Sequence, residues 1–390
     1  QLGAPLCING LVPIDYEENG TRKTKNIRIN RIHLEEDAGK LIHDDHDDVS
    51  LADYNRCGVP IIEIVTEPDM SSAAEAKAFV EKVMLLLKYV GVSDCRMEQG
   101  SVRADVNVSL MRSDDTELGT RAEMKNINSV KFIGKAIDFE ITRQSRLLDM
   151  GQKIVQETRR FDVESGETKT MRSKENAHDY RYFPEPDIPP IEFTDEQLNA
   201  VRNSLPELPE QRMERYQNEF GLNEIDAKIL VSDKLISDLF DSAIGFYNAP
   251  ISICKFINGE FMRRLKLGEI TPDALPFTAE QLAKLVEMSD AERITKDSTK
   301  EIFKEMSEAC SDPETIAEKR GLLISNDIGK AVGIIEKVIS ENEKAVAQYR
   351  SGDIKVFGFI MGQCTKALKG VCTPKVIKEE LEKRLMQNSI

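Results

Sequence analysis

The amino-acid sequence predicts an α+β protein in which a mainly antiparallel sheet with helices comes first and helices alone follow. Three observations support this prediction. Short apolar or alternating segments are confined to the part before Pro190, two long amphipathic patterns lie among them, and from Asp195 onward the pattern is helical. The length of 390 residues allows two or three domains. We expect a catalytic cradle domain at residues 1–194, a helical domain at 195–321 and a helical tail domain at 322–390.

The composition excludes several classes of protein. Charged residues make up 31% and hydrophobic residues 40%, as in an ordinary globular chain. A net charge of −15 argues against a general nucleic-acid binder, so DNA is not expected as a partner. No apolar run approaches the ~18 residues of a membrane span, and no secretory peptide is visible. The seven cysteines are scattered without a CxxC pair, which favours the reducing cytoplasm over a disulfide framework or a zinc site.

The stretch that organises the chain is residues 58–70, GVPIIEIVTEPDM. Its β-branched apolar run is typical of a strand that is covered on both faces. Glu63 stands in the middle of the run, where an ionised carboxylate is costly unless a positive charge meets it. Upstream, residues 32–40, IHLEEDAGK, also bring carboxylates from a strand end to a glycine turn. Two strands that deliver acids to one place, with no His/Cys cluster beside them, suggest a hard divalent cation with oxygen ligands.

The neighbouring segments carry ordinary signals of secondary structure. Residues 26–34 alternate with a phase slip, as in a bulged strand. Residues 71–90 predict an amphipathic helix that begins with the capping box Ser72-x-x-Glu75. The acidic run at residues 43–48 resembles a metal cluster, but we interpret it as a solvated loop.

Residues 95–110 predict a strand with apolar side chains on one face and polar side chains on the other, and residues 121–126 continue the pattern. Paired antiparallel, the two strands would form a sheet with an apolar face and an ionic floor that carries Arg103, Asp105, Glu123 and Lys125. Because side chains alternate along a strand, Glu98 would fall on the apolar face. It can join the ionic floor only if Gly100 carries a bulge. The alternative is a solvent-facing sheet with cross-strand salt bridges.

After a second predicted helix at residues 129–150, residues 156–172 predict a hairpin that carries arginines, and a proline-stiffened aromatic segment follows at 179–190. Guanidinium groups suit oxyanions because they present a planar fork of donors. We therefore predict that the phosphates of a cofactor are bound by Arg159, Arg160 and Arg181. For each arginine, the alternative role is pairing with one of the many local acids.

The tail inverts the charge of the chain. Between Lys355 and Lys378 there are five lysines and no acid, which suggests the phosphate backbone of a nucleic acid as partner. We assign this contact to Lys355, Lys366, Lys369 and Lys375. Ordinary solvated helix faces are the alternative. Gly358 and Gly362 stand one helical turn apart, which would allow another backbone to approach closely.

The motifs of the common nucleotide-binding and hydrolase families, the P-loop, GxGxxG, GxSxG and HExxH, are absent from the sequence. A carboxylate-rich pocket with arginines and a lysine is nevertheless what phosphoryl transfer requires, because Mg²⁺ neutralises phosphates and cationic side chains stabilise the charge of the transition state. The residues alone thus predict a Mg²⁺-dependent kinase or ligase.

Six segments together resemble the family of B subunits of the aspartyl/glutamyl-tRNA amidotransferase. They are IHLEEDAGK (32–40), GVPIIEIVTEPD (58–69), MEQGSVRADVNVSL (97–110), AEMKNINS (122–129), QETRRFD (156–162) and DYRYFPEPDIPP (179–190). Residues 349–384 resemble the YqeY-type tail of the same family. The archaeal E subunit shares the core but carries an inserted domain, for which this sequence has no room.

The resemblance implies a glutamine-synthetase-like cradle and a two-step amidation. ATP and Mg²⁺ would serve to phosphorylate the side-chain carboxylate of mischarged Glu-tRNA(Gln) or Asp-tRNA(Asn), and ammonia would then displace phosphate. The ammonia would come through a channel from an amidase-type A subunit, and a small C subunit would complete the heterotrimer. The glutaminase nucleophile would belong to the A subunit, so this chain would need no nucleophilic serine or cysteine.

The resemblance also assigns roles to individual residues. Glu36 and Glu63 match the metal-ligating glutamates of the family, and Glu98 and Glu123 are the second set. Substrate or phosphate contacts fall to Arg103, Asp105 and Lys125. The first segment of the family, with its Glu-x-His ligand element, is not in this sequence, and since the chain starts at Gln1 without a methionine we expect an N-terminal segment to be missing.

Two other hypotheses stand beside the amidotransferase. A glutamine-synthetase-like ligase for a small molecule would turn over free glutamate and would not need the lysines of the tail. A non-enzymatic tRNA-binding scaffold would keep its affinity for tRNA but would not bind Mg²⁺-ATP.

Overall fold

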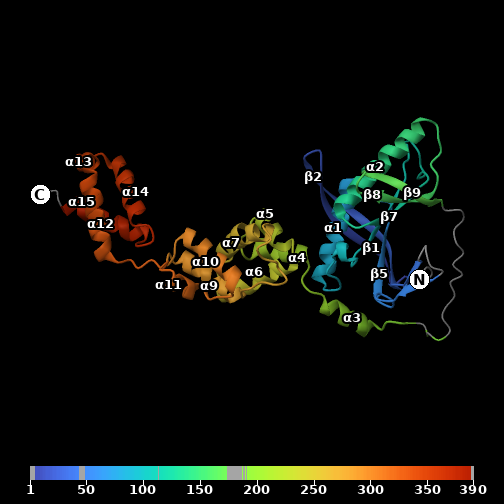
Figure 1. Cartoon of the computed structure of the whole chain (residues 1–390), viewed down its shortest axis with the longest axis horizontal. Coiled ribbons are helices and arrows are strands. Elements are labelled where there is room, and N and C mark those ends of the chain that lie inside the picture. Colours follow the sequence, from blue (N-terminus) through green and yellow to red (C-terminus); the bar gives the residue numbers. More distant parts are fainter. Residues whose placement is uncertain are drawn as a thin grey trace. The chain divides into compact units, whose positions relative to one another are not determined.

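The computed structural model describes residues 5–43, 49–112, 114–173, 187, 189 and 191–387, and the chain divides into two compact units. The first unit, residues 1–208, contains the described strands, and the second, residues 209–390, is helical (Figure 1). The predicted α+β class is therefore confirmed. Helix α3 (Asp195–Ser204), which we expected to open the helical domain, belongs to the first unit. None of the described helices combines the length and the hydrophobicity that a membrane span needs.

The first sheet consists of three antiparallel strands in the order β1 (Cys7–Glu18), β2 (Thr21–Glu36) and β5 (Pro60–Thr66). A bulge between Ile29 and Arg31 shifts the register of β2 against β5, which confirms the predicted phase slip. One face packs on helix α1 (Ala73–Tyr89), and the buried side chains there are Ile14, Ile27, Ile29 and Phe79.

Strand β5 lies at the edge of this sheet, and the exposure of its side chains shows that our prediction of a strand covered on both faces is wrong. Ile62 is 42% exposed, and Glu63 is exposed as well. Edge strands and central strands can carry the same apolar run, and only the pairing of the strands distinguishes them. Because Glu63 is hydrated, its charge does not require a buried positive partner.

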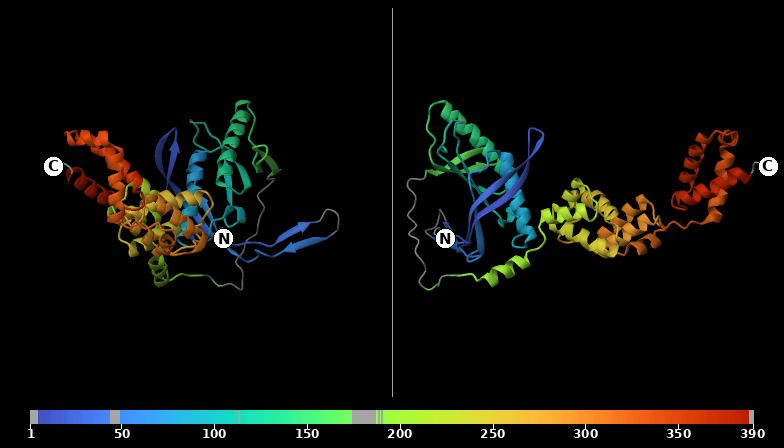
Figure 2. Two further views of the ribbon diagram at one scale, coloured as in Figure 1. Left: turned by 60° about the vertical axis from the view of Figure 1, so that its left-hand side comes forward. Right: turned by 180° about the vertical axis from the view of Figure 1, so that it is seen from behind.

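A hairpin separate from both larger sheets lies between β2 and β5 in the chain. It consists of β3 (Lys40–His43) and β4 (Ser50–Asp53), and its side chains Leu41, Ile42 and Leu51 are exposed. The left view of Figure 2 shows this hairpin projecting from the unit. Residues 44–48, which make up most of the acidic run that we interpret as a loop, lie outside the described residues.

The second sheet consists of β6 (Ala104–Val108), β7 (Ala122–Ile127), β8 (Glu157–Asp162) and β9 (Glu167–Ser173), in that order. Strands β6 and β7 pair antiparallel, and β8 and β9 form a hairpin, as predicted. Helix α2 (Val130–Asp149) connects β7 to β8, and these two strands pair in parallel. The helix covers the apolar face of the sheet, where the buried side chains include Val108, Met124, Ile133 and Ala136.

The predicted strand at residues 95–110 is shorter in the structure. Met97–Gln99 form a 3₁₀ turn, η1, which ends at Gly100 with a φ of 74°. This left-handed conformation suits glycine, which has no Cβ, and it ends the turn before β6 begins. Glu98 is therefore an exposed residue of the turn and does not join the ionic floor through a strand bulge.

The start of α1 agrees with half of the predicted capping box. The Ser72 hydroxyl accepts a hydrogen bond from the Glu75 backbone N–H at 3.2 Å. The Glu75 carboxylate does not close the box on Ser72. It accepts from the Ser71 backbone N–H at 2.7 Å and pairs with Lys25 at 2.9 Å, which ties the helix to β2.

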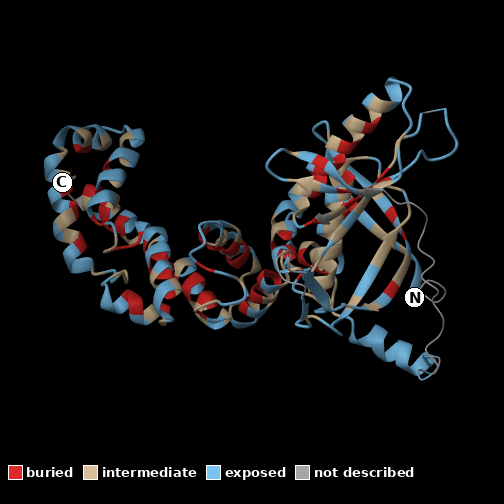
Figure 3. Cartoon of the chain, turned by 45° about the vertical axis from the view of Figure 1, so that its right-hand side comes forward, coloured by how far each residue is buried: buried red, intermediate tan, exposed pale blue. Residues whose placement is uncertain are grey.

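The second unit contains two separate buried clusters, and Figure 3 shows the buried residues on its helices. The first cluster includes Phe240, Phe261 and Phe303. Its helices are α4 (Pro209–Asn218), α5 (Glu224–Val231), α6 (Lys234–Phe246), α7 (Pro250–Phe256), the π-helical turn η2 (Ile257–Phe261), α8 (Met262–Lys266), α9 (Ala279–Asp290), α10 (Lys296–Ala309) and α11 (Pro313–Lys319).

The second cluster belongs to the tail and includes Ile335, Ile360 and Leu381. Its helices are α12 (Ile328–Glu341), α13 (Glu343–Arg350), α14 (Phe357–Ala367) and α15 (Pro374–Gln387), with the 3₁₀ turn η3 (Ile354–Val356) before α14. The tail thus has a hydrophobic core of its own.

Candidate active site

The predicted ionic floor is present on the face of the second sheet opposite α2. Strands β6 and β7 place Asn107 opposite Glu123 and Val106 opposite Met124. Met124 is fully buried against the helix, whereas Asp105 is exposed on the floor. The antiparallel pairing that we predicted for these two strands is confirmed, and so is the separation of their faces.

The other two strands extend the ionic floor. Strand β8 places Thr158 opposite Glu123 and Arg160 opposite Lys125, and β9 places Lys169 opposite Arg160. Side chains that lie directly opposite on neighbouring strands point to the same face of a sheet. Lys125, Arg160 and Lys169 therefore form a line of cations across three strands, which we call the cationic row.

Carboxylates accompany the cationic row. The Lys125 Nζ atom lies 3.3 Å from Asp105 Oδ2 and 3.4 Å from Glu123 Oε1. Burial alone would lower the pKa of Lys125, but these two carboxylates outweigh burial and raise the pKa above its ordinary value, so the side chain is cationic at neutral pH.

The other two members of the cationic row are more exposed. Lys169 forms an ion pair with Asp162, and this contact is the main reason why the pKa of Asp162 falls to about 2. Arg160 is exposed and makes no ion pair within the part of the chain that the structure describes. A guanidinium group at this position suits an anionic ligand, because it presents a planar fork of donors.

Arg159 points away from the cationic row because neighbouring residues of a strand face opposite sides. It is 8% exposed, and its Nε atom lies 3.0 Å from Glu140 Oε1 on α2. It also pairs with Glu157 at 2.5 Å and donates to the Thr168 hydroxyl at 2.8 Å. These contacts favour the alternative role that we gave this arginine, which is pairing with local acids.

Glu140 is fully buried and is the centre of this cluster. Arg143 donates to both of its oxygens at 2.9 Å, and the Thr168 hydroxyl and the Gln144 amide donate to it as well. Burial alone would raise the pKa of Glu140, but these hydrogen bonds outweigh burial and hold the pKa below its ordinary value. The carboxylate is therefore ionised at neutral pH.

The structure does not bring Glu36 and Glu63 together. In the pairing of β2 with β5, Glu63 lies opposite His33, and Glu36 lies opposite Pro60. The two glutamates are thus an odd number of positions apart and project from opposite faces of the sheet. Both are exposed.

Arg103, which we assigned to the ionic floor, contacts the end of β2. Its Nη2 atom lies 3.2 Å from Asp37 Oδ2, and Arg56 Nε lies 2.7 Å from the same oxygen. Arg56 also donates to the Gly100 carbonyl oxygen at 2.9 Å. Burial alone would raise the pKa of Asp37, but the two arginines outweigh burial and lower it. This cluster connects the first sheet to the segment that enters β6.

The carboxylates that we predicted as metal ligands do not form a site by themselves. Within the described ranges, no three His, Cys, Asp or Glu side chains come close enough together to hold a metal ion. The four carboxylates that we predicted as metal ligands are Glu36, Glu63, Glu98 and Glu123. The described residues therefore do not fit a complete Mg²⁺ site. Arg181, which we assigned to the cofactor, lies outside the described residues.

The four lysines that we predicted to contact nucleic acid are exposed on the tail, and they are Lys355, Lys366, Lys369 and Lys375. Lys369 pairs with Asp297 of α10 at 2.7 Å, in an ion pair that is open to solvent. Gly358 and Gly362 are also exposed, and a Cβ atom on either would meet open space. No backbone of the described chain approaches these two glycines closely.

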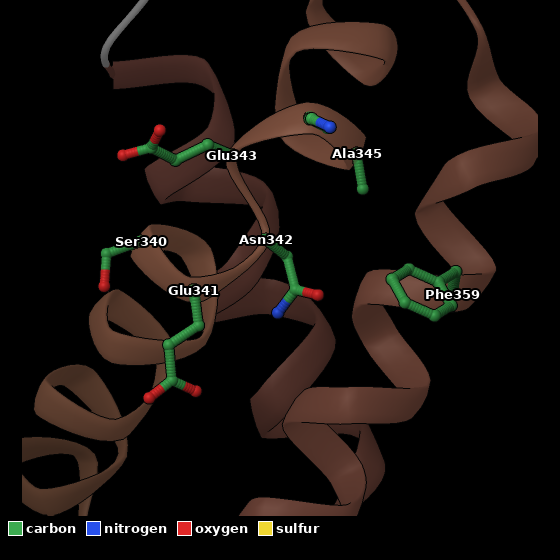
Figure 4. Close-up of a pocket in the computed structure, with 7 residues that line it drawn as sticks. Ser340, Glu341, Asn342, Glu343, Ala345 and Phe359 are labelled. Atoms are coloured by element: carbon green, nitrogen blue, oxygen red, sulfur yellow. The ribbon is translucent and has the colours of Figure 1, made fainter.

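A cavity of about 450 Å³ lies in the tail between the end of α12, the start of α13 and α14. Figure 4 shows Phe359 across from Asn342, with Glu341 and Glu343 on the other side of the loop. None of the four predicted lysines lines this cavity. Its lining carries two acidic residues and one lysine, Lys344, so its net negative charge makes it a poor site for phosphate.

Sequence comparisons relate the whole chain to one family. Residues 1–199 match the model of the GatB/GatE catalytic domain, and residues 238–385 match the model of the GatB domain. The chain is 52% identical to the B subunit of the aspartyl/glutamyl-tRNA(Asn/Gln) amidotransferase of Ruminiclostridium cellulolyticum, over 99% of this chain and 79% of the relative. The B subunits of the same name from Lachnoclostridium phytofermentans and a Thermoanaerobacter species are 44% and 46% identical, and the matches cover 99% and 98% of this chain and 80% of each relative.

The buried cluster under the ionic floor predicts a pH-dependent stability. Because the pKa of Glu140 is lowered by folding, its contribution is present above the unfolded pKa of about 4.3 and is lost as the pH falls through the folded value. We expect Glu140→Gln to lower the free energy of unfolding by about 3 kcal/mol at pH 7, since it leaves the buried Arg159 and the half-buried Arg143 without their partner. The loss should shrink at pH 4 and below. Urea denaturation at both pH values measures it.

Asp138→Asn is the matched control, because Asp138 is an exposed acid on the same helix. It should change the free energy of unfolding by less than about 0.5 kcal/mol at either pH. An equal pH dependence in the wild type and in Glu140→Gln would contradict the role that we give to this carboxylate.

Proposed function

Since the chain belongs to the family of aspartyl/glutamyl-tRNA(Asn/Gln) amidotransferase B subunits, we propose that it activates the amino acid of a mischarged tRNA. In this proposal, ATP phosphorylates the side-chain carboxylate of Glu-tRNA(Gln), of Asp-tRNA(Asn) or of both, and ammonia then forms the amide. The observation that supports the proposal most is the cationic row, which lies beside the carboxylates of the ionic floor.

The chemistry explains why a row of cations is needed. A carboxylate is a poor acyl donor, because its leaving group would be an oxide. Transfer of the γ-phosphoryl group of ATP to a carboxylate oxygen gives an acyl phosphate and ADP. Ammonia can then attack the carbonyl carbon, and phosphate leaves. Cationic side chains such as Lys125 and Arg160 stabilise the negative charge of the phosphoryl group during transfer.

Mg²⁺ and ATP are the cofactors that we propose. Asp105 and Glu123 offer the oxygen donors that Mg²⁺ prefers. Because the described carboxylates do not gather into a complete site, we assign no step of the reaction to the metal. The contribution of this chain is to bind phosphate oxygens through the cationic row.

We also propose that the chain works in the cytoplasm with an amidase-type A subunit and a small C subunit. The relatives are named as the B subunits of an amidotransferase, and such a name belongs to one part of a complex. The seven cysteines are all free, as suits a reducing compartment. Ammonia delivered by the A subunit would reach the acyl phosphate through an internal channel, and the exposed lysines of the tail would contact the tRNA.

Lys125→Met should abolish most of the activation step. We expect ADP formation by the reconstituted complex with mischarged tRNA to fall by about 10²-fold or more, because a cation that faces the phosphoryl group is lost. Binding of the tRNA should be retained, which shows that the variant is folded. Lys131→Met, at an exposed lysine of α2, is the control and should leave the rate unchanged.

The competing functions give other results in the same assay. ADP formation with free glutamate and no tRNA would favour a small-molecule ligase. Binding of tRNA without any ADP formation by the wild-type complex would favour a non-enzymatic scaffold. Either result would contradict the proposal.

The tail lysines predict a salt dependence of tRNA binding. We expect replacement of Lys355, Lys366 and Lys375 by Gln to weaken binding and to reduce the slope of log Kd against log salt concentration by about 1 per lysine. Fluorescence titrations between low and moderate salt measure the slope. The control replaces the exposed lysines Lys330, Lys337 and Lys344 of α12 and α13. An equal change of slope in the control would refute the assignment.

A further inference from the structure

We propose that Thr158 is a positioning residue, which holds the Glu123 carboxylate in place beside Lys125. This inference rests on the proposed function, because it gives Thr158 a purpose in the same site. Thr158 is 2% exposed, and its hydroxyl donates to Glu123 Oε2 at 3.1 Å. The other oxygen of Glu123, Oε1, is the one that lies 3.4 Å from Lys125 Nζ. The two oxygens of one carboxylate thus have different partners.

The position of Thr158 follows from the pairing of the strands. It lies directly opposite Glu123 in the parallel pair of β7 and β8. A glutamate side chain rotates about three bonds, and a hydrogen bond to one oxygen restricts where the other oxygen can point. The Thr158 hydroxyl therefore limits the orientations of Glu123 and keeps Oε1 directed toward Lys125. In metal and catalytic sites, partners of this kind behind a functional carboxylate typically affect activity by about 10–100-fold.

A purely structural role for Thr158 makes a different prediction. Threonine is common in strands because its branched side chain packs well there, and valine has almost the same shape. Valine lacks only the hydroxyl, which is the group that the positioning role requires. Serine keeps the hydroxyl but loses the methyl group. The two replacements therefore separate packing from hydrogen bonding.

The test uses the complete three-subunit complex. We expect Thr158→Val to lower kcat for ADP formation by about 10-fold while KM for mischarged tRNA stays unchanged, because only the reacting end of the site is disturbed. Thr158→Ser should restore kcat to within about 2-fold of the wild type. The control is Thr299→Val in α10, another buried threonine whose hydroxyl donates to a backbone carbonyl, and it should leave kcat unchanged.

A second measurement decides the inference without relying on activity. The rate at which acetic anhydride acetylates Lys125, followed by mass spectrometry, should rise several-fold in Thr158→Val as Glu123 disengages, and should stay at the wild-type value in Thr158→Ser and Thr299→Val. Unchanged labelling in Thr158→Val, or a kcat of Thr158→Ser as low as that of Thr158→Val, would overturn the positioning role. A wild-type complex that forms no ADP with mischarged tRNA would defeat the proposed function, and the labelling would still decide the role of Thr158.

Discussion

The buried carboxylate of Glu140, which Arg143 and Arg159 share, is the interaction on which the candidate site depends. It joins α2 to the underside of β8 and so fixes which face of that strand points toward the helix. Because side chains alternate along a strand, an inward Arg159 requires that Arg160 project into the ionic floor. Breaking a buried pair costs about 3–5 kcal/mol, whereas exposed pairs contribute about 1 kcal/mol or less. The fixed charges of this cluster therefore lie below the sheet, and the exposed cations above it, Arg160 and Lys169, can turn toward a ligand.

Local periodicity was sufficient to predict much of the fold. The bulge in β2, the two long helices of the first unit and the antiparallel pair of β6 and β7 all depend on residues that are near one another in the sequence. The same alternation showed that Glu123 and Lys125 share a face. These features could be predicted because each one is decided by its own segment.

The features that could not be predicted depend on pairing between distant segments. The parallel register of β7 and β8 spans a whole helix, and it brings Thr158 and Arg160 into the ionic floor, to which the β8–β9 hairpin then adds Lys169. The alternation of side chains along a strand shows that Arg159 and Arg160 face opposite sides of the sheet. Only the register of β8 against β7 decides which of the two joins the ionic floor. Likewise, the apolar run of β5 does not reveal that this strand lies at the edge of its sheet. Only the pairing of β2 with β5 shows that Glu36 and Glu63 project from opposite faces.

In the proposed function, the cationic row receives the phosphates of ATP. A structure of the complete complex with a non-hydrolysable ATP analogue tests this claim most directly. We expect oxygens of the triphosphate to lie within hydrogen-bonding distance, about 3 Å, of Lys125 Nζ and the Arg160 guanidinium group. A triphosphate bound elsewhere, with Lys125 still paired only with Asp105 and Glu123, would contradict the account.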